Sequence, residues 1–196
     1  MLIKSIKMLI RLFVITSLFI TGCINRTNEP GVDMARANGS DDMHSSYEEL
    51  VKQSPIIMGS WENIQFGDLK ILAPSGKDWK KGSDRIFINN VNGCTIIFQS
   101  QAGDYRKNMD EYLSSYNEVN KRDAPKYELL SQKIGKVKGI LAARVHGRFD
   151  NGEEMATRDY VLFTNYGVSI LQGRSKEKDE EYLNDMIDYI VAHIHY

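Results

Sequence analysis

The fold of this chain can be predicted mainly from residues 140–174, which read ILAARVHGRFDNGEEMATRDYVLFTNYGVSILQGR. Three apolar-rich runs, at 140–149, 155–163 and 168–174, are joined by turns that contain the polar sequences Asp-Asn-Gly-Glu and Thr-Asn-Tyr-Gly. Short apolar runs joined by Asn- and Gly-rich turns predict antiparallel strands connected by hairpins. Together with a further run at 127–134, the pattern indicates a four-strand antiparallel meander.

The run at 140–149 separates its residues into two alternating sets. Neighbouring residues of a strand point to opposite faces of the sheet, and an antiparallel sheet commonly packs one face on the core while the other meets water. We therefore expect one covered face and one solvent-exposed face. The more polar set is Ala142, Arg144, His146 and Arg148, and the other set is mostly apolar, with Leu141, Ala143, Val145 and Phe149.

Earlier in the chain, strands are expected at 66–73, 85–89 and 94–101, the last two joined by an Asn92-Gly93 turn. Between the first two lies a polar loop containing Trp79, which we expect to fold back onto the core. The spacing of apolar residues then changes to a helical period at 108–119 and again from 177 to about 193, with Asn108 and Ser175 as candidate caps. The predicted fold class is α+β, a largely antiparallel sheet flanked by helices.

The beginning of the chain is of a different kind. Residues 12–23, LFVITSLFITGC, follow Lys4, Lys7 and Arg11 with no acidic residue before them. The apolar run is shorter than the ~20 residues of a membrane span, but it suits the core of a signal peptide. Its ending, Ile20-Thr21-Gly22-Cys23, resembles a bacterial lipobox.

That resemblance implies cleavage before Cys23, diacylglycerol on its thiol and often a further acyl chain on the new amino terminus. Two or more chains anchor a protein stably, because each buried methylene contributes ~0.8 kcal/mol. The expected location is therefore the cell envelope, with the domain outside the cytoplasm. Because Ile24 is not the aspartate of inner-membrane retention, we expect the outer membrane where the cell has two. The alternative is an uncleaved N-terminal helix with a chance cysteine.

The chain divides into three parts on this interpretation. Residues 1–22 form the signal peptide, 23–60 hold the lipidated cysteine and a flexible tether, and 61–196 form a single α+β domain. Within the tether, Ser46 and Glu49 have capping-box spacing and favour a short helix.

The charge balance argues against two classes of partner. The signal peptide removes three of the 25 basic residues, which leaves 22 against 26 acidic ones. Such a mildly acidic chain argues against nucleic acid, and against a polybasic membrane patch.

The order of elements after residue 60 resembles the PsbP/DcrB-like superfamily. The residues that carry the resemblance are a strand, Pro74 and a tryptophan within 66–79, the helix around Tyr112-Leu113, the turn into a strand at 138–142, and the closing helix at 187–194. It spans residues 62–194 and implies an α/β/α sandwich. Members of the superfamily share protein binding rather than catalytic residues. The resemblance therefore implies a non-enzymatic protein-binding module, of an immunity or assembly type, that docks a partner on its sheet or on loops such as 74–84 and 150–154.

Several polar residues could form a binding surface. Arginine clusters suit carboxylate or phosphate recognition, so a partner- or anion-binding face is one hypothesis, and a small-ligand or anion binder is the alternative function. The other interpretation is a solvent-exposed sheet face with cross-strand pairs to Glu153, Glu154 and Asp159. The candidate site residues are Trp79, Arg144, His146, Arg148, Arg158 and Arg174.

Catalytic and metal-binding roles find less support. Cys94 lies in a strand-like run and is expected to be a small buried hydrophobe. His193 and His195 lack an acidic or thiol partner nearby in sequence, and His44 lies beside Asp41 and Asp42 in what is expected to be a solvated charge run. We find neither phosphate-loop spacing nor a nucleophile-elbow motif. The sequence predicts no cofactor, no metal site and no enzyme.

Overall fold

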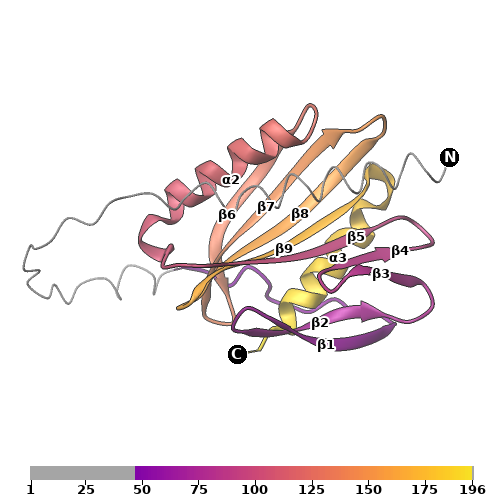
Figure 1. Ribbon diagram of the computed structural model, residues 1–196, viewed down its shortest axis with the longest axis horizontal. Coiled ribbons are helices and arrows are strands. Elements are labelled where there is room, and N and C mark those ends of the chain that lie inside the picture. The colour runs from indigo at the N-terminus through magenta and orange to yellow at the C-terminus, as the bar shows by residue number, and fades with distance from the viewer. Residues whose placement is uncertain (1–46, 196) are drawn as a thin grey trace, which may run out of the picture. The chain divides into compact units, whose positions relative to one another are not determined.

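The computed structural model describes residues 47–195. Nine strands and two α-helices lie within that range (Figure 1). The strands are β1 (Ser60–Phe66), β2 (Leu69–Ser75), β3 (Trp79–Ser83), β4 (Ile86–Asn89), β5 (Thr95–Ala102), β6 (Glu128–Val137), β7 (Ile140–Asp150), β8 (Glu154–Phe163) and β9 (Gly167–Lys176). The α-helices are α2 (Met109–Asp123) and α3 (Glu180–Ala192), and each follows a single 3₁₀ turn, η3 (Arg106–Asn108) or η4 (Glu177–Asp179).

Seven of the strands form one sheet in the order β3-β4-β5-β9-β8-β7-β6, and all its neighbours pair antiparallel. β1 and β2 form a separate hairpin. The predicted fold class and the four-strand meander are therefore confirmed. The expected strand at 66–73 is interrupted, because Gly67 has a φ of +60° and turns the chain between β1 and β2. That left-handed conformation suits glycine.

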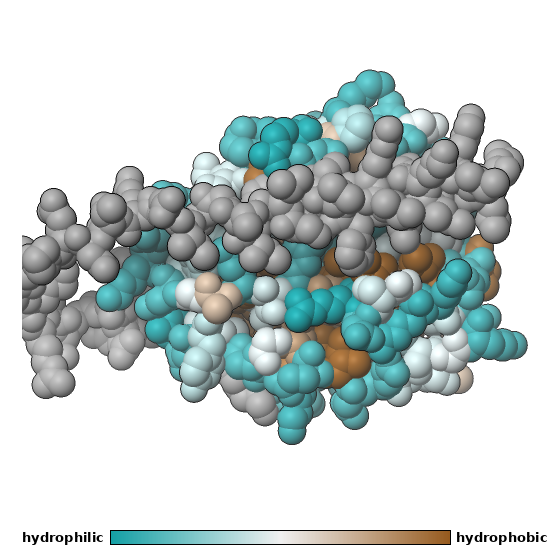
Figure 2. Space-filling model, in the orientation of Figure 1, coloured by the Kyte–Doolittle hydropathy of each residue, from teal (hydrophilic) through white to brown (hydrophobic). Residues whose placement is uncertain are grey.

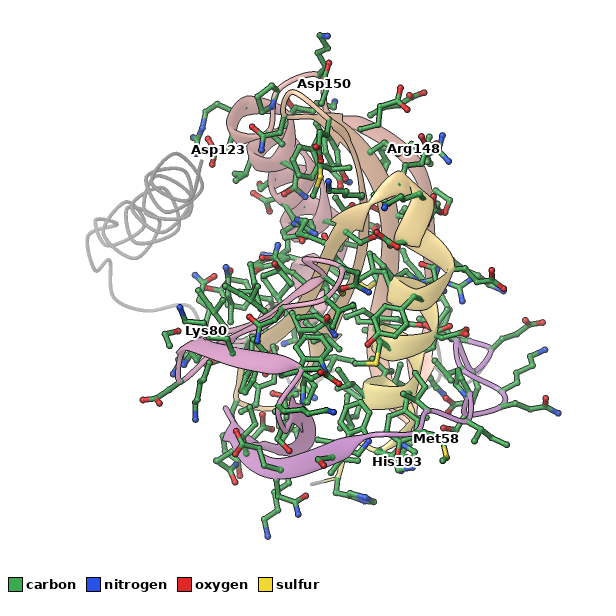
Figure 3. The ribbon with its side chains drawn as sticks, turned by 90° about the vertical axis from the view of Figure 1, so that its right-hand side faces the viewer. Met58, Lys80, Asp123, Arg148, Asp150 and His193 are labelled. Atoms are coloured by element: carbon green, nitrogen blue, oxygen red, sulfur yellow. The ribbon has the colours of Figure 1, made fainter. Side chains whose placement is uncertain are left out.

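Two helices cover opposite faces of the sheet, as Figure 3 shows with α2 on one side and α3 on the other. α3 packs on the main core through a stripe of buried residues at helical spacing. These residues are Leu183, Met186, Ile187, Ile190 and Val191. Gly173 of β9 lies directly beneath them, since a Cβ there would come within 2.6 Å of Leu183 Cδ1.

α2 covers the opposite face over β7, β8 and β9, where Met109 and Leu113 pack with residues such as Phe163. The expectation of a solvent-exposed face on the 140–149 strand is therefore wrong, because a helix lies over each face. Ser175 is not a helix cap: it lies inside β9, and the residue before α3 is Asp179. Asn108 does precede α2, but its side chain makes no capping hydrogen bond.

The segment before β1 packs on the domain in an extended form. No helix occurs in residues 47–59, where the capping-box spacing favoured one. Instead Glu49 forms a parallel bridge with Lys136, and its carboxylate accepts hydrogen bonds from the amides of Lys138 and Gly139 in the β6–β7 turn. Leu50 is buried in the main core. The glutamate expected to cap a helix thus caps a turn far away in sequence.

Among residues 47–195, neither α-helix has the length and apolar character needed to cross a membrane.

Candidate functional site

The expected polar sheet face lies under α3 and is bridged to it by ion pairs. Strand register places Arg144, His146 and Arg148 of β7 on the same face as Arg158 of β8. Acidic residues of η4 and α3 meet them from above. Nη1 of Arg148 lies 2.8 Å from Glu177 Oε1, its Nη2 lies 3.3 Å from Glu180 Oε2, and His146 Nε2 lies 2.8 Å from Glu180 Oε1. Figure 3 shows Arg148 beside one end of α3.

Further along α3, the carboxylate of Asp188 accepts hydrogen bonds from two residues of β8. Arg158 Nη2 lies 3.1 Å from its Oδ2, and the Tyr160 hydroxyl donates to its Oδ1 at 2.9 Å. Burial raises the pKa of Tyr160, and the Asp188 charge raises it further. Arg144 donates to the carbonyl of Leu50 at 3.3 Å. The Arg158 guanidinium is largely covered by this pairing, with 13% of its side chain exposed, whereas the Arg148 side chain stays 43% exposed while its charge is paired with Glu177 and Glu180.

Arg174 does not join this group. It pairs with Thr157 across the β8–β9 ladder, which places it on the α2 face. Its Nη1 lies 2.5 Å from Oδ1 of Asp159, a carboxylate with no exposed surface. Asp159 Oδ2 also accepts the Tyr116 hydroxyl at 2.6 Å, and Gln172 donates to that hydroxyl at 2.8 Å. Arg174 therefore belongs to a buried polar cluster beneath α2.

The cross-strand partners expected for the arginines are only partly found. Asp159 does pair with an arginine, as expected, but Glu153 pairs with Lys176 at 2.7 Å. Glu154 is exposed, and its pKa is raised by a hydrogen bond to Glu177 and by that residue's charge. The main acidic partners, Glu177, Glu180 and Asp188, were not foreseen. Their spacing of three and eight residues places them on one helical face. This spacing was the one sign in the sequence that they could pair with the arginines.

Trp79 has a different setting, at the corner between the β1–β2 hairpin and the end of the large sheet. The expected loop around it is wrong, since Trp79 begins strand β3, but its half-buried side chain packs on the main core as expected. It also lines a surface pocket of about 190 Å³, which we call the Trp79 pocket. The other lining residues are Glu62, Pro74, Ser75, Gly76, Lys81 and Phe87.

The rim of the Trp79 pocket carries both charges over an aromatic wall. Lys81 Nζ lies 3.6 Å from Glu62 Oε1, 3.6 Å from Asp84 Oδ1 and 5.7 Å from the centre of the Phe87 ring. The sequence pointed to Trp79 and to the segment 74–84, which supplies most of the lining, but not to Glu62 or Phe87, since these come from strands β1 and β4 that only the fold brings together.

A second apolar area lies on the α2 side of β4 and β5, beyond the strands that α2 covers. Figure 2 shows hydrophobic surface in this part of the molecule. Ile86 and Ile97 are cross-strand partners there, and Ile88 follows two residues on, opposite Thr95. Ile88 and Ile97 are half-buried.

The remaining candidates have structural settings. Cys94 is buried as expected, and desolvation raises the pKa of its thiol to about 12, with a contribution from the charge of Asp179. The ring of His193 packs at a tilt against that of Tyr189, with ring centres 4.3 Å apart, and the backbone of His195 bridges to Lys70. No group of three or more His, Cys, Asp or Glu side chains within residues 47–195 is arranged to hold a metal ion. Cys23, His44, Asp41 and Asp42 lie outside the described residues.

Neither a protein-family model nor a curated protein sequence matches the chain. Among solved structures, a protein of unknown function from Pseudomonas aeruginosa, termed a putative regulator, is 13% identical with a TM-score of 0.49, covering 68% of this chain and 95% of that one. LpqN, involved in cell envelope biogenesis of Mycobacterium tuberculosis, is 14% identical with a TM-score of 0.49, covering 69% and 89%.

The cyanobacterial PsbP of Synechocystis sp. PCC 6803 is 11% identical with a TM-score of 0.47, covering 74% of this chain and 98% of that one. A PsbP structure is thus among those that the chain resembles. Similarity at this level carries no argument about activity or partners.

Proposed function

We propose that this chain is a bacterial cell-envelope lipoprotein, anchored through Cys23, whose domain binds another protein at the Trp79 pocket without catalysis. The anchor rests on the sequence alone: positive charges, a short apolar core, and Ile20-Thr21-Gly22-Cys23. The binding surface rests on the structure of residues 47–195.

The observation that carries the proposal is the contrast between Trp79 and the other five candidates. Arg144, His146, Arg148, Arg158 and Arg174 each contact a carboxylate or a backbone carbonyl of the same domain. Trp79 instead lines a pocket at the surface of the described domain. Tryptophan is the side chain most enriched at the energetic centres of protein interfaces.

The size and lining of the pocket favour a side chain of a partner over a metabolite. Its 190 Å³ is below the ~300–1,000 Å³ typical of small-molecule sites. The lining includes neither histidine nor cysteine, and its lysine lies close to its glutamate. That composition combines aromatic and polar walls with a charged pair at the rim, and mixed surfaces of this kind occur in protein interfaces.

Site-specific photo-cross-linking in intact cells tests the proposal. A photoreactive residue at Lys81, on the pocket rim, should give one adduct of defined mass, while the same residue at Lys107, an exposed lysine of η3, should not. Trp79→Ala should remove the adduct. Because Trp79 also packs on the core, Glu62→Lys provides a second pocket variant that leaves the core intact.

The absence of an adduct at residue 81, or identical adducts at residues 81 and 107, would refute binding at the pocket. Loss of the adduct in Trp79→Ala but not in Glu62→Lys, together with a lowered melting temperature, would show that unfolding caused the loss. The anchor is tested separately, by the fate of a Cys23→Ser chain.

A further inference from the structure

Among residues 47–195, backbone partners cover the outer edge of strand β6 only near its end. Near the end of β6, the backbone of Lys136 is hydrogen-bonded to the segment before β1. The amide of Leu50 donates to the Lys136 carbonyl at 2.7 Å, and the Lys136 amide donates to the Glu48 carbonyl at 2.8 Å. Residues 128–133 are all exposed. Two of them are leucines, with Leu129 36% and Leu130 38% exposed. Unpaired strand edges with apolar side chains are sites of strand addition.

The opposite edge of the sheet differs. β3 has only five residues, with a break in its pairing between Lys81 and Ser83. Lys80 and Lys81 on it are exposed, and Figure 3 shows Lys80 pointing away from the sheet. Short, charged and irregular edges resist strand pairing. The open half of β6 is therefore the edge better suited to an added strand.

The charges of this open half are complementary to a second copy of themselves. Glu128 pairs with Arg148 and Lys133 pairs with Arg144, so both side chains lie on the α3 face. They stand at opposite ends of the open half and have opposite signs. When two such strands meet antiparallel, each Glu128 faces the Lys133 of the other copy, whereas a parallel arrangement would place like charges together.

The bulge in β6 makes this register geometrically allowed. Pairing with β7 shifts by one residue between Leu129 and Ser131, so Leu130 is the extra residue. Because of this bulge, Leu129 and Leu130 together occupy one position of the strand, and Ser131 therefore lies midway between Glu128 and Lys133. Leu129 then faces Gln132 of the other copy, and both lie on the α2 face, since their β7 partners are Gly147 and Val145. Side chains that face one another thus belong to the same face, as a continuous sheet requires.

We infer that two copies of this chain associate through the open half of β6, residues 128–133, antiparallel around Ser131. The two sheets join into one, and β3 with the Trp79 pocket lies at the opposite end of each sheet from the joint. The interface is thus independent of the proposed partner site.

Disulfide trapping tests the inference. Directly opposed residues of antiparallel strands have Cα atoms about 4.5–5.5 Å apart, which is within the ~4.4–6.8 Å range of disulfides. Ser131→Cys in the full chain, oxidised in native membranes, should therefore yield a covalent dimer. Ser115→Cys, an exposed serine of α2, is the matched control. The unsubstituted chain sets the background from Cys23 and Cys94.

Exchanging the charges of Glu128 and Lys133 tests whether the two strands meet in the inferred register. Glu128→Lys in the Ser131→Cys background places lysine against lysine twice, and should lower the yield of dimer roughly tenfold. Adding Lys133→Glu restores opposite charges and should restore the yield. Lys133 also lies 3.6 Å from Glu48, so melting temperatures of all variants are compared to exclude loosening of that contact.

A Ser131→Cys yield no higher than that of Ser115→Cys would overturn the inference. That result would leave the open half of β6 to another protein or to another segment of this chain. A dimer whose yield is unchanged by Glu128→Lys would overturn the register and, with it, the self-complementarity argument.

Discussion

The buried pair of Asp159 and Arg174 separates a structural from a binding role for Arg174. The Asp159 side chain has no exposed surface and that of Arg174 is 14% exposed. The carboxylate accepts from Arg174 and from the Tyr116 hydroxyl, which in turn accepts from Gln172. Removing one member of the pair leaves the other charged and buried without its partner.

The size of the effect follows from that burial. Breaking a buried ion pair by removing one partner costs ~3–5 kcal/mol of the free energy of unfolding. For a domain of this size the melting temperature should fall by roughly 6–20 °C. Replacing both, as Asp159→Leu with Arg174→Met, removes both desolvated charges and should recover part of the loss. About 1–3 kcal/mol should remain, because the Tyr116 hydroxyl loses its acceptor, and Tyr116→Phe should recover part of it.

The assay is urea unfolding of the four members of the double-mutant cycle, with Asp84→Ala as the control. Asp84 is 99% exposed, so its removal should leave the midpoint unchanged. A loss of less than about 1 kcal/mol in each single variant, or two losses that simply add, would contradict a structural role for the pair. In either case Arg174 would again be available as a binding residue.

Three further outcomes follow from the packing. Gly173→Ala should cost about 1–3 kcal/mol in unfolding free energy, since the new Cβ would lie 2.6 Å from Leu183 Cδ1. Gly82→Ala is the control and should be neutral, because its Cβ would meet Ile86 at 3.5 Å. Equal stabilities of the two variants would contradict the close fit of α3. Cys94, with its thiol pKa raised to about 12, should resist thiol reagents at neutral pH until the domain unfolds, and rapid labelling of the folded protein would contradict its burial. Burial raises the pKa of several tyrosines above the usual value of 10, so the folded state keeps protons that the unfolded state loses, and stability should fall as pH rises above about 10. The chain has ten tyrosines, so the signal of the buried ones is isolated as the part of the tyrosinate absorbance that their Phe variants lack. That part should increase together with unfolding, and an earlier increase would contradict the assignment of the buried phenols: Tyr112 and Tyr127, with pKa values of about 12, and Tyr116 and Tyr160, which are raised as well.

Local patterns in the sequence predicted most of the elements. Alternation and Asn-Gly turns gave the meander, and helical spacing placed α2 and α3 within a few residues of their observed ends. The turn at Gly67 was missed, because a single glycine inside an apolar run does not reveal its φ.

The side-chain faces were harder to predict, because they depend on register. Arg158 and Arg174 were expected on one face, but Arg158 pairs with Gly173 across the β8–β9 ladder. Arg174 therefore points the other way, toward Asp159. A change of one residue in register moves a side chain to the opposite face, and the sequence of a four-residue turn does not fix that register. The Trp79 pocket as a whole could not be predicted from the sequence for a related reason, since its walls come from four different strands.

The mass of the amino-terminal peptide of the chain recovered from membranes tests the lipid anchor, on which the proposed location depends. This peptide should begin at Cys23 and carry a diacylglyceryl group on its sulfur. A Cys23→Ser chain should remain unprocessed and free of lipid. An unmodified Cys23, or a Cys23→Ser chain that is still cut and still partitions with detergent, would contradict the anchor.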